Sequence, residues 1–152
     1  MIKQACALVC ALLVGTDAVA CSDNSVKLRG DFGTARFSIE VADDPGERAQ
    51  GLMFRERMAA SSGMLFLYER PQRLSFWMRN TLIELDILFV DARGVVQKVH
   101  HRAQPHDETP IDGGQGIAAL EINGGLAKRM GIVPGAELQH PFFGADAAWP
   151  CE

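Results

Sequence analysis

Several short stretches of this chain have the hydrophobic period of β-strands. Residues 35–42 alternate between apolar and polar side chains, which predicts a half-buried strand. Residues 63–69 and 75–78 are short apolar runs that predict two more strands. Residues 85–90 are apolar at every position except Asp86, so we expect a central strand that is covered on both faces.

A helix signal follows the first of these strands. In the sequence DDPGE, Asp44 can cap a helix, Pro45 suits its first turn and Glu47 completes a capping box. The pattern predicts a short helix that ends near Gly51, where a residue without a Cβ suits the end of a helix.

The second half of the chain predicts a hairpin, a loop and three further elements. Residues 91–94 can form a tight turn, after which residues 95–101 return antiparallel. Residues 102–116 contain two prolines and three glycines and read as a long polar loop. A strand, a short helix and a last strand are expected at residues 117–123, 124–131 and 133–139. Together these elements predict an α+β fold of mostly antiparallel strands, a small, partly closed barrel with two short helices.

The chain begins with the pattern of an export signal. Residues 1–20 place Lys3 before an apolar run and end in Ala-Val-Ala, as in a secretory signal peptide with its cleavage site. The apolar run is shorter than a transmembrane helix requires, and no later segment is long enough. We therefore expect a leader or first short strand at residues 21–34, a single domain with a C-terminal tail at residues 35–152, and a periplasmic or secreted protein without a transmembrane span.

Cleavage would leave two cysteines, Cys21 and Cys151, near the two ends of the mature chain. In an oxidising compartment such a pair suggests a disulfide, which would stabilise the fold by about 4–5 kcal/mol in the chain-entropy model. The alternatives are a lipid anchor on Cys21, directly after the small-residue site, and two free thiols.

The charge of the mature chain argues against nucleic acid as a partner. Removing residues 1–20 takes away Lys3 and Asp17, one charge of each sign, and leaves the net charge at −4. Phosphate binding depends on clustered Lys and Arg side chains, and no basic stripe is present in the sequence.

Four motifs resemble the bacterial and archaeal family called domain of unknown function 192. They are GLMFR, GMLF, FWMRNTLIELDILFV and ALEINGGLAKRMGI, at residues 51–55, 63–66, 76–90 and 119–132. The resemblance implies a compact, β-rich, often exported domain with no established activity. Family members usually have proline at the position of Glu84, which implies an exposed turn and no catalytic role for that residue.

Asp86 is the polar residue that most needs a partner, because its neighbours are apolar. Arg55 and Arg79 are the candidates for a bidentate pair with its carboxylate. The alternative is that Asp86, Asn80 and an arginine form the polar floor of a ligand pocket. Otherwise Asn80 is expected to act as a turn former, together with Thr81.

Aromatic residues and a second carboxylate adjoin this group. Trp77, with Phe54 and Phe76, could line a small-molecule pocket or belong to the core. Glu121 lies in the apolar sequence AALEIN and could join Asp86 in general acid–base chemistry.

The sequence thus favours a non-catalytic binding module for a small polar ligand or an envelope component. The candidate ligand-binding residues are Arg55, Trp77, Arg79, Asn80, Asp86 and Glu121. One alternative is a hydrolase that uses Asp86 and Glu121. The other is a copper-handling protein that uses His100, His101, His106, Met53, Met64 and Met78. We expect no cofactor, no bound metal and a monomer.

Overall fold

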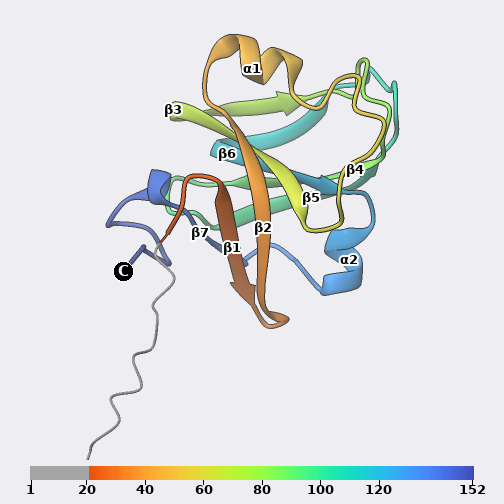
Figure 1. Cartoon of the computed structure of the whole chain (residues 1–152). Helices are drawn as coiled ribbons and strands as arrows, with labels where there is room; N and C mark the ends of the chain where they lie inside the picture. The colour runs from red at the N-terminus through yellow and green to blue at the C-terminus, as the bar shows by residue number, and fades with distance from the viewer. Residues whose placement is uncertain (1–20) are drawn as a thin grey trace, which may run out of the picture.

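A computed structural model describes residues 21–152, which form one curled seven-stranded sheet with two short α-helices (Figure 1). The elements are β1 (Ser25–Gly30), β2 (Gly33–Ala42), α1 (Pro45–Gln50), β3 (Ser62–Phe76), β4 (Leu85–Val90), β5 (Val96–Ala103), β6 (Ile111–Asn123), α2 (Leu126–Met130), β7 (Glu137–Gln139) and the 3-10 helix η1 (Pro141–Phe143). The expected signal segment, residues 1–20, lies outside the described residues.

The strands follow the order β5-β4-β6-β3-β2-β1-β7, and the two outer strands approach each other again. All neighbours are antiparallel except β2 and β3, which are parallel. Val95, just before β5, bridges Glu137 in β7, and the Leu138 N–H donates to the Gly94 carbonyl at 2.7 Å. The curled sheet with its two helices confirms the predicted α+β, partly closed barrel.

Two apolar clusters lie on the two faces of this sheet. One cluster includes residues from all seven strands, together with α2. The second covers the opposite face of β3, β4 and β6. Along β4, Leu88 belongs to the first cluster and Ile87 and Phe89 to the second, and all six residues of the strand are buried. The prediction of a central strand covered on both faces is confirmed.

The predicted start and end of α1 are confirmed. The Asp44 carboxylate accepts a hydrogen bond from the Glu47 N–H at 2.8 Å, and the Glu47 side chain accepts one from the Asp43 N–H at 3.2 Å. Gly51 ends the helix with a φ of +49°, a conformation that favours glycine.

The hairpin between β4 and β5 is also confirmed. The Asp91 carboxylate accepts from the N–H groups of Arg93 and Val95, both at 2.9 Å, and Gly94 has a φ of +80°. A side chain that accepts from nearby backbone N–H groups is the usual way in which aspartate fixes a turn.

One predicted break and one predicted loop are wrong. Residues 63–69 and 75–76 belong to the single strand β3, which ends at Phe76, because the exposed polar segment between them stays extended across an irregular pairing with β6. The expected loop at residues 102–116 is shorter, because β6 begins at Ile111. A Cβ on Gly113 would lie 2.2 Å from the Phe89 ring. The glycines there permit close packing of β6 on β4.

The chain ends pack against the sheet. Residues 25–30 of the expected leader form β1, while the last strand, expected at residues 133–139, spans only Glu137–Gln139. In the tail, Phe143 is buried in the first cluster. Cys21 and Cys151 form a disulfide with their Cα atoms 5.7 Å apart. Within residues 21–152, no helix is both long and apolar enough to cross a membrane.

Candidate functional site

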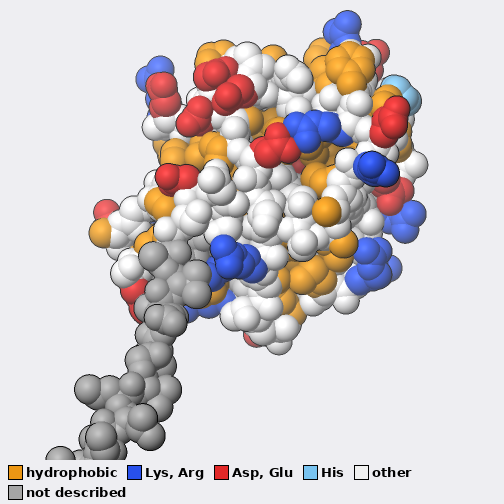
Figure 2. Space-filling view, viewed as in Figure 1, with side chains coloured by type: hydrophobic (Ala, Val, Ile, Leu, Met, Phe, Trp, Pro, Cys, Tyr) orange, Lys and Arg blue, Asp and Glu red, His pale blue; other side chains and the backbone are white. Residues whose placement is uncertain are grey.

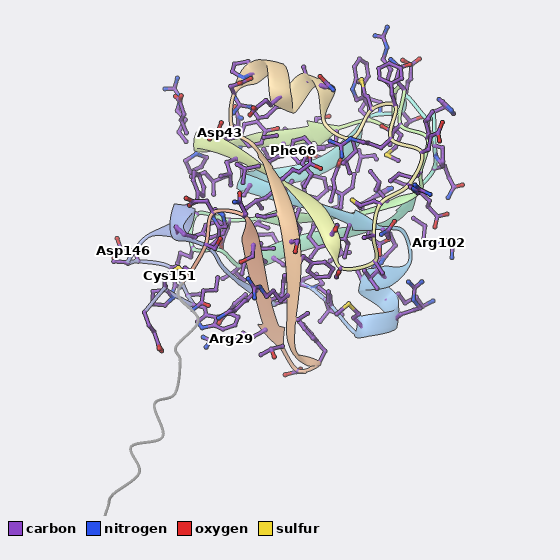
Figure 3. All side chains as sticks on the ribbon, in the orientation of Figure 1. Arg29, Asp43, Phe66, Arg102, Asp146 and Cys151 are labelled. Carbon is purple, nitrogen blue, oxygen red and sulfur yellow. A yellow bond between two sulfur atoms is a disulfide. The ribbon has the colours of Figure 1, made fainter. Side chains whose placement is uncertain are left out.

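A pocket of about 410 Å³ opens between α1, β3 and the segment that leads into β4. Phe66 lies below α1 and forms part of the pocket wall (Figure 3). Leu52, Phe76 and Trp77 also contribute to the apolar part of the lining. This volume lies within the range of small-molecule sites, about 300–1,000 Å³.

Glu121, in β6, is the buried acid of this pocket. Its neighbours across the sheet are Met64 of β3 and Ile87 of β4, so the carboxyl group emerges on an apolar face. Glu121 is 4% exposed, and its carboxyl group accepts no hydrogen bond from the described residues. Because no enclosed polar side-chain atom of residues 21–152 lacks a partner, the carboxyl oxygens open onto the pocket. Burial raises the pKa of Glu121 to about 8, since removal from water penalises the charged form. At pH 7 the empty pocket therefore holds a mostly neutral carboxylic acid.

Arg48 and Tyr68 occupy the α1 side of the pocket. The Arg48 guanidinium lies 4.9 Å from the centre of the Tyr68 ring and donates to the Leu67 carbonyl at 2.8 Å. Burial raises the pKa of Tyr68; the Arg48 charge acts in the opposite direction, and the Glu121 charge adds to the rise. These contacts hold Arg48 at a fixed place in the pocket wall.

Trp77 and Arg79 form the opposite side. Trp77 is 46% exposed, and the Arg79 guanidinium lies 5.4 Å from the centre of its ring. Arg79 Nε is 3.4 Å from a carboxylate oxygen of Glu108. The buried Thr81 hydroxyl donates to the Arg79 carbonyl at 3.2 Å and fixes the backbone of this turn.

Two turns beside the pocket each contain a residue with a left-handed backbone conformation. Phe54 has a φ of +64° and Asn80 a φ of +52°, and the Phe54 N–H donates to the Asn80 carbonyl at 2.8 Å. Asn80 tolerates this conformation better than Phe54 does. Asn80 therefore acts as a turn former, as expected, and does not line the pocket.

Asp86 is fully buried on the other face of the sheet, and its partners are backbone N–H groups. Its carboxylate accepts from Arg102 at 2.8 Å, Gly125 at 2.9 Å and Ala127 at 2.8 Å. Arg102 lies near α2 in Figure 3. Since α2 has no cap from its own side chains, Asp86 supplies acceptors for the start of that helix from a neighbouring strand.

The expected arginine partner of Asp86 is therefore wrong, and so is its place in a pocket floor. Arg55 instead forms a bidentate pair with Glu40, with both N–O distances at 2.7 Å, and this pairing lowers the pKa of the Glu40 carboxyl. Of the six candidate residues, Trp77, Arg79 and Glu121 line the pocket, whereas Arg55, Asn80 and Asp86 do not.

The two carboxylates required by the hydrolase alternative point to opposite faces of the sheet. In the register of β4 and β6, Asp86 is opposite Ile122 and Ile87 is opposite Glu121. Because successive side chains alternate between faces, the two acids cannot flank one cleft.

The residues of the copper alternative do not converge either. Met53, Met64 and Met78 line three different pockets, and of the histidines only His100 lies beside one of them, Met78. Within residues 21–152, no group of three His, Cys, Asp or Glu side chains could hold a metal ion.

The comparisons with other proteins identify a family. The sequence model of DUF192, described as an uncharacterized ACR, matches residues 26–140. The chain belongs to the DUF192 family. A protein of unknown function from Novosphingobium aromaticivorans DSM 12444 is 45% identical, with a TM-score of 0.73 over 75% of this chain and 82% of that one.

A second solved structure supports the same fold. It comes from Sinorhizobium meliloti 1021 and is provisionally described as a transcription regulator. It is 38% identical, with a TM-score of 0.74 over 79% of this chain and 95% of that chain. The sequence has no match among curated proteins.

This member of the DUF192 family has Glu84 where the resemblance implies proline, in the turn before β4. Its carboxylate pairs with Arg102 at 3.1 Å and accepts from the Gln104 side chain at 2.9 Å. The predicted turn is present at residues 79–80, whereas Glu84 itself is half-buried and not exposed as expected.

Sequence reasoning missed Arg48 and Tyr68 as pocket residues of the DUF192 domain. For Tyr68 a signal existed: it follows Met64 and Phe66 at the period of a strand, so it shares the face of Glu121. For Arg48 no such signal existed, because its place in the pocket depends on how α1 lies across this face of the sheet.

Proposed function

We propose that this DUF192 protein is a non-catalytic binding module that takes a small polar ligand, or a small polar part of an envelope component, into the pocket of Glu121. The observation that carries this proposal is the Glu121 carboxyl group, which is buried, accepts no hydrogen bond from the described chain and lines a pocket with four aromatic residues. The carboxyl oxygens open onto the pocket, so a ligand there can donate hydrogen bonds to them.

Binding fits this site better than catalysis does. The second carboxylate, Asp86, is on the other face of the sheet, where it accepts three backbone hydrogen bonds. Tyr68, Arg48 and Arg79 suit the recognition of a polar ligand, and none of them is hydrogen-bonded to Glu121 as a catalytic partner would be.

A role in binding nucleic acid is not part of the proposal, although one relative is described as a transcription regulator. Figure 2 shows Lys and Arg side chains spread among acidic and apolar ones on the face viewed. Arg29, Arg55 and Arg73 are each paired with a carboxylate. The formal net charge of −4 also disfavours phosphate backbones.

The proposal places the protein outside the cytoplasm, in the periplasm or secreted, as a single-domain monomer after removal of residues 1–20. The disulfide between Cys21 and Cys151 supports this location, since disulfides persist mainly in oxidising compartments. Mass spectrometry of the purified mature protein tests it: cleavage after Ala20 with two oxidised thiols is expected, and a diacylglycerol adduct on Cys21 would contradict it.

The binding proposal is tested by a thermal-shift screen of sugars, peptidoglycan fragments, amino acids and metal ions. A ligand that binds only the folded state raises the melting temperature. Hits should lose their effect in Trp77→Ala and Glu121→Gln, which alter the pocket, and keep it in Arg73→Gln, whose exposed ion pair lies elsewhere. Hits that survive in both pocket variants would place binding at another site.

A further inference from the structure

We infer that the ligand of this pocket is a small zwitterion, with its cationic nitrogen against Glu121 and its anionic group at Arg48 and Arg79. This inference rests on the proposed binding function and specifies the ligand class. It follows from the charges that line the pocket and from the places that each charge occupies.

The cationic end is assigned by Glu121. The strands on both sides present Met64 and Ile87 to this residue, and neither side chain can donate a hydrogen bond. The carboxyl group therefore depends on the contents of the pocket for a donor. A positively charged nitrogen is the strongest such partner, because a charge-assisted hydrogen bond in a site of low dielectric constant exceeds a neutral one.

Aromatic rings around the acid favour a cation as well. Phe66, Tyr68, Phe76 and Trp77 line the same pocket as Glu121. Aromatic faces attract cations, and this molecule already shows it twice: Arg48 lies over Tyr68, and Arg79 over Trp77.

The same two arginines assign the anionic end. Arg48 is held by the carbonyl groups of Asp43 and Leu67, and it has no carboxylate partner among the ion pairs of the described chain. Arg79 is paired only through Nε with the exposed Glu108, which leaves its terminal nitrogens available to a ligand. A ligand that carried only a positive charge would be repelled by both guanidinium groups. An anionic group on the same molecule turns that repulsion into attraction.

The size of the pocket limits this class to small molecules. A volume of about 410 Å³ is near the lower end of ligand sites, so it suits a molecule the size of an amino acid or a betaine. A long polymer could enter only by one end.

The test uses four compounds that share one skeleton and differ only in charge. They are phenylalanine (zwitterion), phenylalaninamide (cation), N-acetylphenylalanine (anion) and N-acetylphenylalaninamide (neutral), with the matching leucine compounds as a second series. Binding to the full mature protein is measured by calorimetry and thermal shift at pH 6.5. We expect the zwitterion to bind most tightly in at least one series, by about tenfold over the other three forms.

Variants connect each charge to its residue. Glu121→Gln should weaken the zwitterion about tenfold and leave the anionic compound unaffected, whereas Arg79→Gln should weaken the zwitterion and leave the cationic compound unaffected or tighter. Arg55→Gln, outside the pocket, is the matched control. If Glu121→Gln does not fold, the order of the four compounds on the unaltered protein still decides the matter.

Proton release gives an independent readout. In the empty pocket Glu121 is mostly protonated at neutral pH, so pairing with a cation expels one proton to solvent. The titratable and charged groups that line the pocket with it are Tyr68 from β3, Arg48 from α1 and Arg79 from the turn. The affinity for phenylalanine, whose ammonium group keeps its charge and its donors between pH 6 and 8, should therefore rise with pH up to about pH 8, and this rise should disappear in Glu121→Gln.

The possible outcomes separate this inference from the proposed function. If the neutral or anionic compounds bind in the pocket as well as the zwitterion, the pocket is a binding site and the charge assignment is wrong. If no compound of any charge class binds in either series, the inference fails, and the binding proposal fails with it only if the wider thermal-shift screen also finds no ligand.

Discussion

Asp86 and Glu121 are buried carboxylates on neighbouring strands, and they differ in their supply of hydrogen-bond donors. Asp86 faces the inside of the barrel and accepts three backbone N–H groups, two of them from the start of α2. Glu121 faces the opposite cluster and accepts none within the described chain. The difference teaches that burial alone does not make an acid a candidate for ligand binding: the fold supplies the donors of Asp86 and leaves the Glu121 carboxyl open to the pocket.

The largest effect on stability is expected from a substitution of Asp86. Asp86→Ala should lower the free energy of unfolding by about 3–5 kcal/mol, because three buried N–H groups lose their acceptor. Asp86→Asn, which keeps one acceptor oxygen, should cost less. Chemical denaturation followed by circular dichroism measures both. A loss below about 1 kcal/mol for Asp86→Ala would contradict the structural role of this carboxylate.

The pH dependence of stability tests the state of Glu121. Its pKa rises from near 4.5 in the unfolded chain to about 8 in the folded one, so the folded protein binds more protons between these values. Stability from this group is present below pH 4.5 and is lost as pH rises toward 8, by at most about 1.4 kcal/mol per pH unit. Denaturation at several pH values should show this slope in the native protein and not in Glu121→Gln. Equal slopes in both would rule out the raised pKa.

A change at Glu121 should also have the opposite sign to one at Asp86. Glu121→Met keeps the length of the side chain and removes the unpaired carboxyl, so we expect a gain of about 1–2 kcal/mol at pH 7 without ligand. The same denaturation measurement applies, with Glu121→Gln as the polar control. A marked loss of stability would show that the carboxyl is satisfied in the folded protein.

The smallest effect is expected at an exposed pair, which serves as a reference for both buried acids. Arg55 and Glu40 form a bidentate ion pair at the surface. Arg55→Gln should change the free energy of unfolding by about 0–1 kcal/mol, since solvent screens such pairs. Addition of salt should reduce even this difference. A larger cost would mean that the pair also supports the packing of the turn beside it.

Local signals made part of the fold predictable. The α1 cap, the hairpin turn at Asp91 and the buried strand β4 depend on residues close in sequence, and the structure has all three. The start of β6 was not predictable, because the glycines around Gly113 read as a loop until the position of Phe89 is known. Packing across strands, which is not local, decides such cases.

The candidate site shows the same division. Glu121 stood out because it interrupts an apolar strand, and the structure places it in the pocket with Trp77 and Arg79. Asp86 stood out for the same reason, yet two of its donors, the N–H groups of Gly125 and Ala127, are about 40 residues away in the sequence. Because every residue except proline has a backbone N–H group, the sequence does not indicate which ones a side chain will meet. Residue type alone could not separate the two acids.

The disulfide between Cys21 and Cys151 has a mechanical consequence. The two cysteines are 130 positions apart, so the disulfide closes nearly all of the described chain, including every strand of the barrel, into one covalent ring. A tensile load applied at the two ends would be carried by the sulfur–sulfur bond, and the sheet would bear almost none of it. For the same reason, a protease that cuts one exposed loop would leave a nicked molecule in one piece, and the two fragments would separate only under reducing and denaturing conditions.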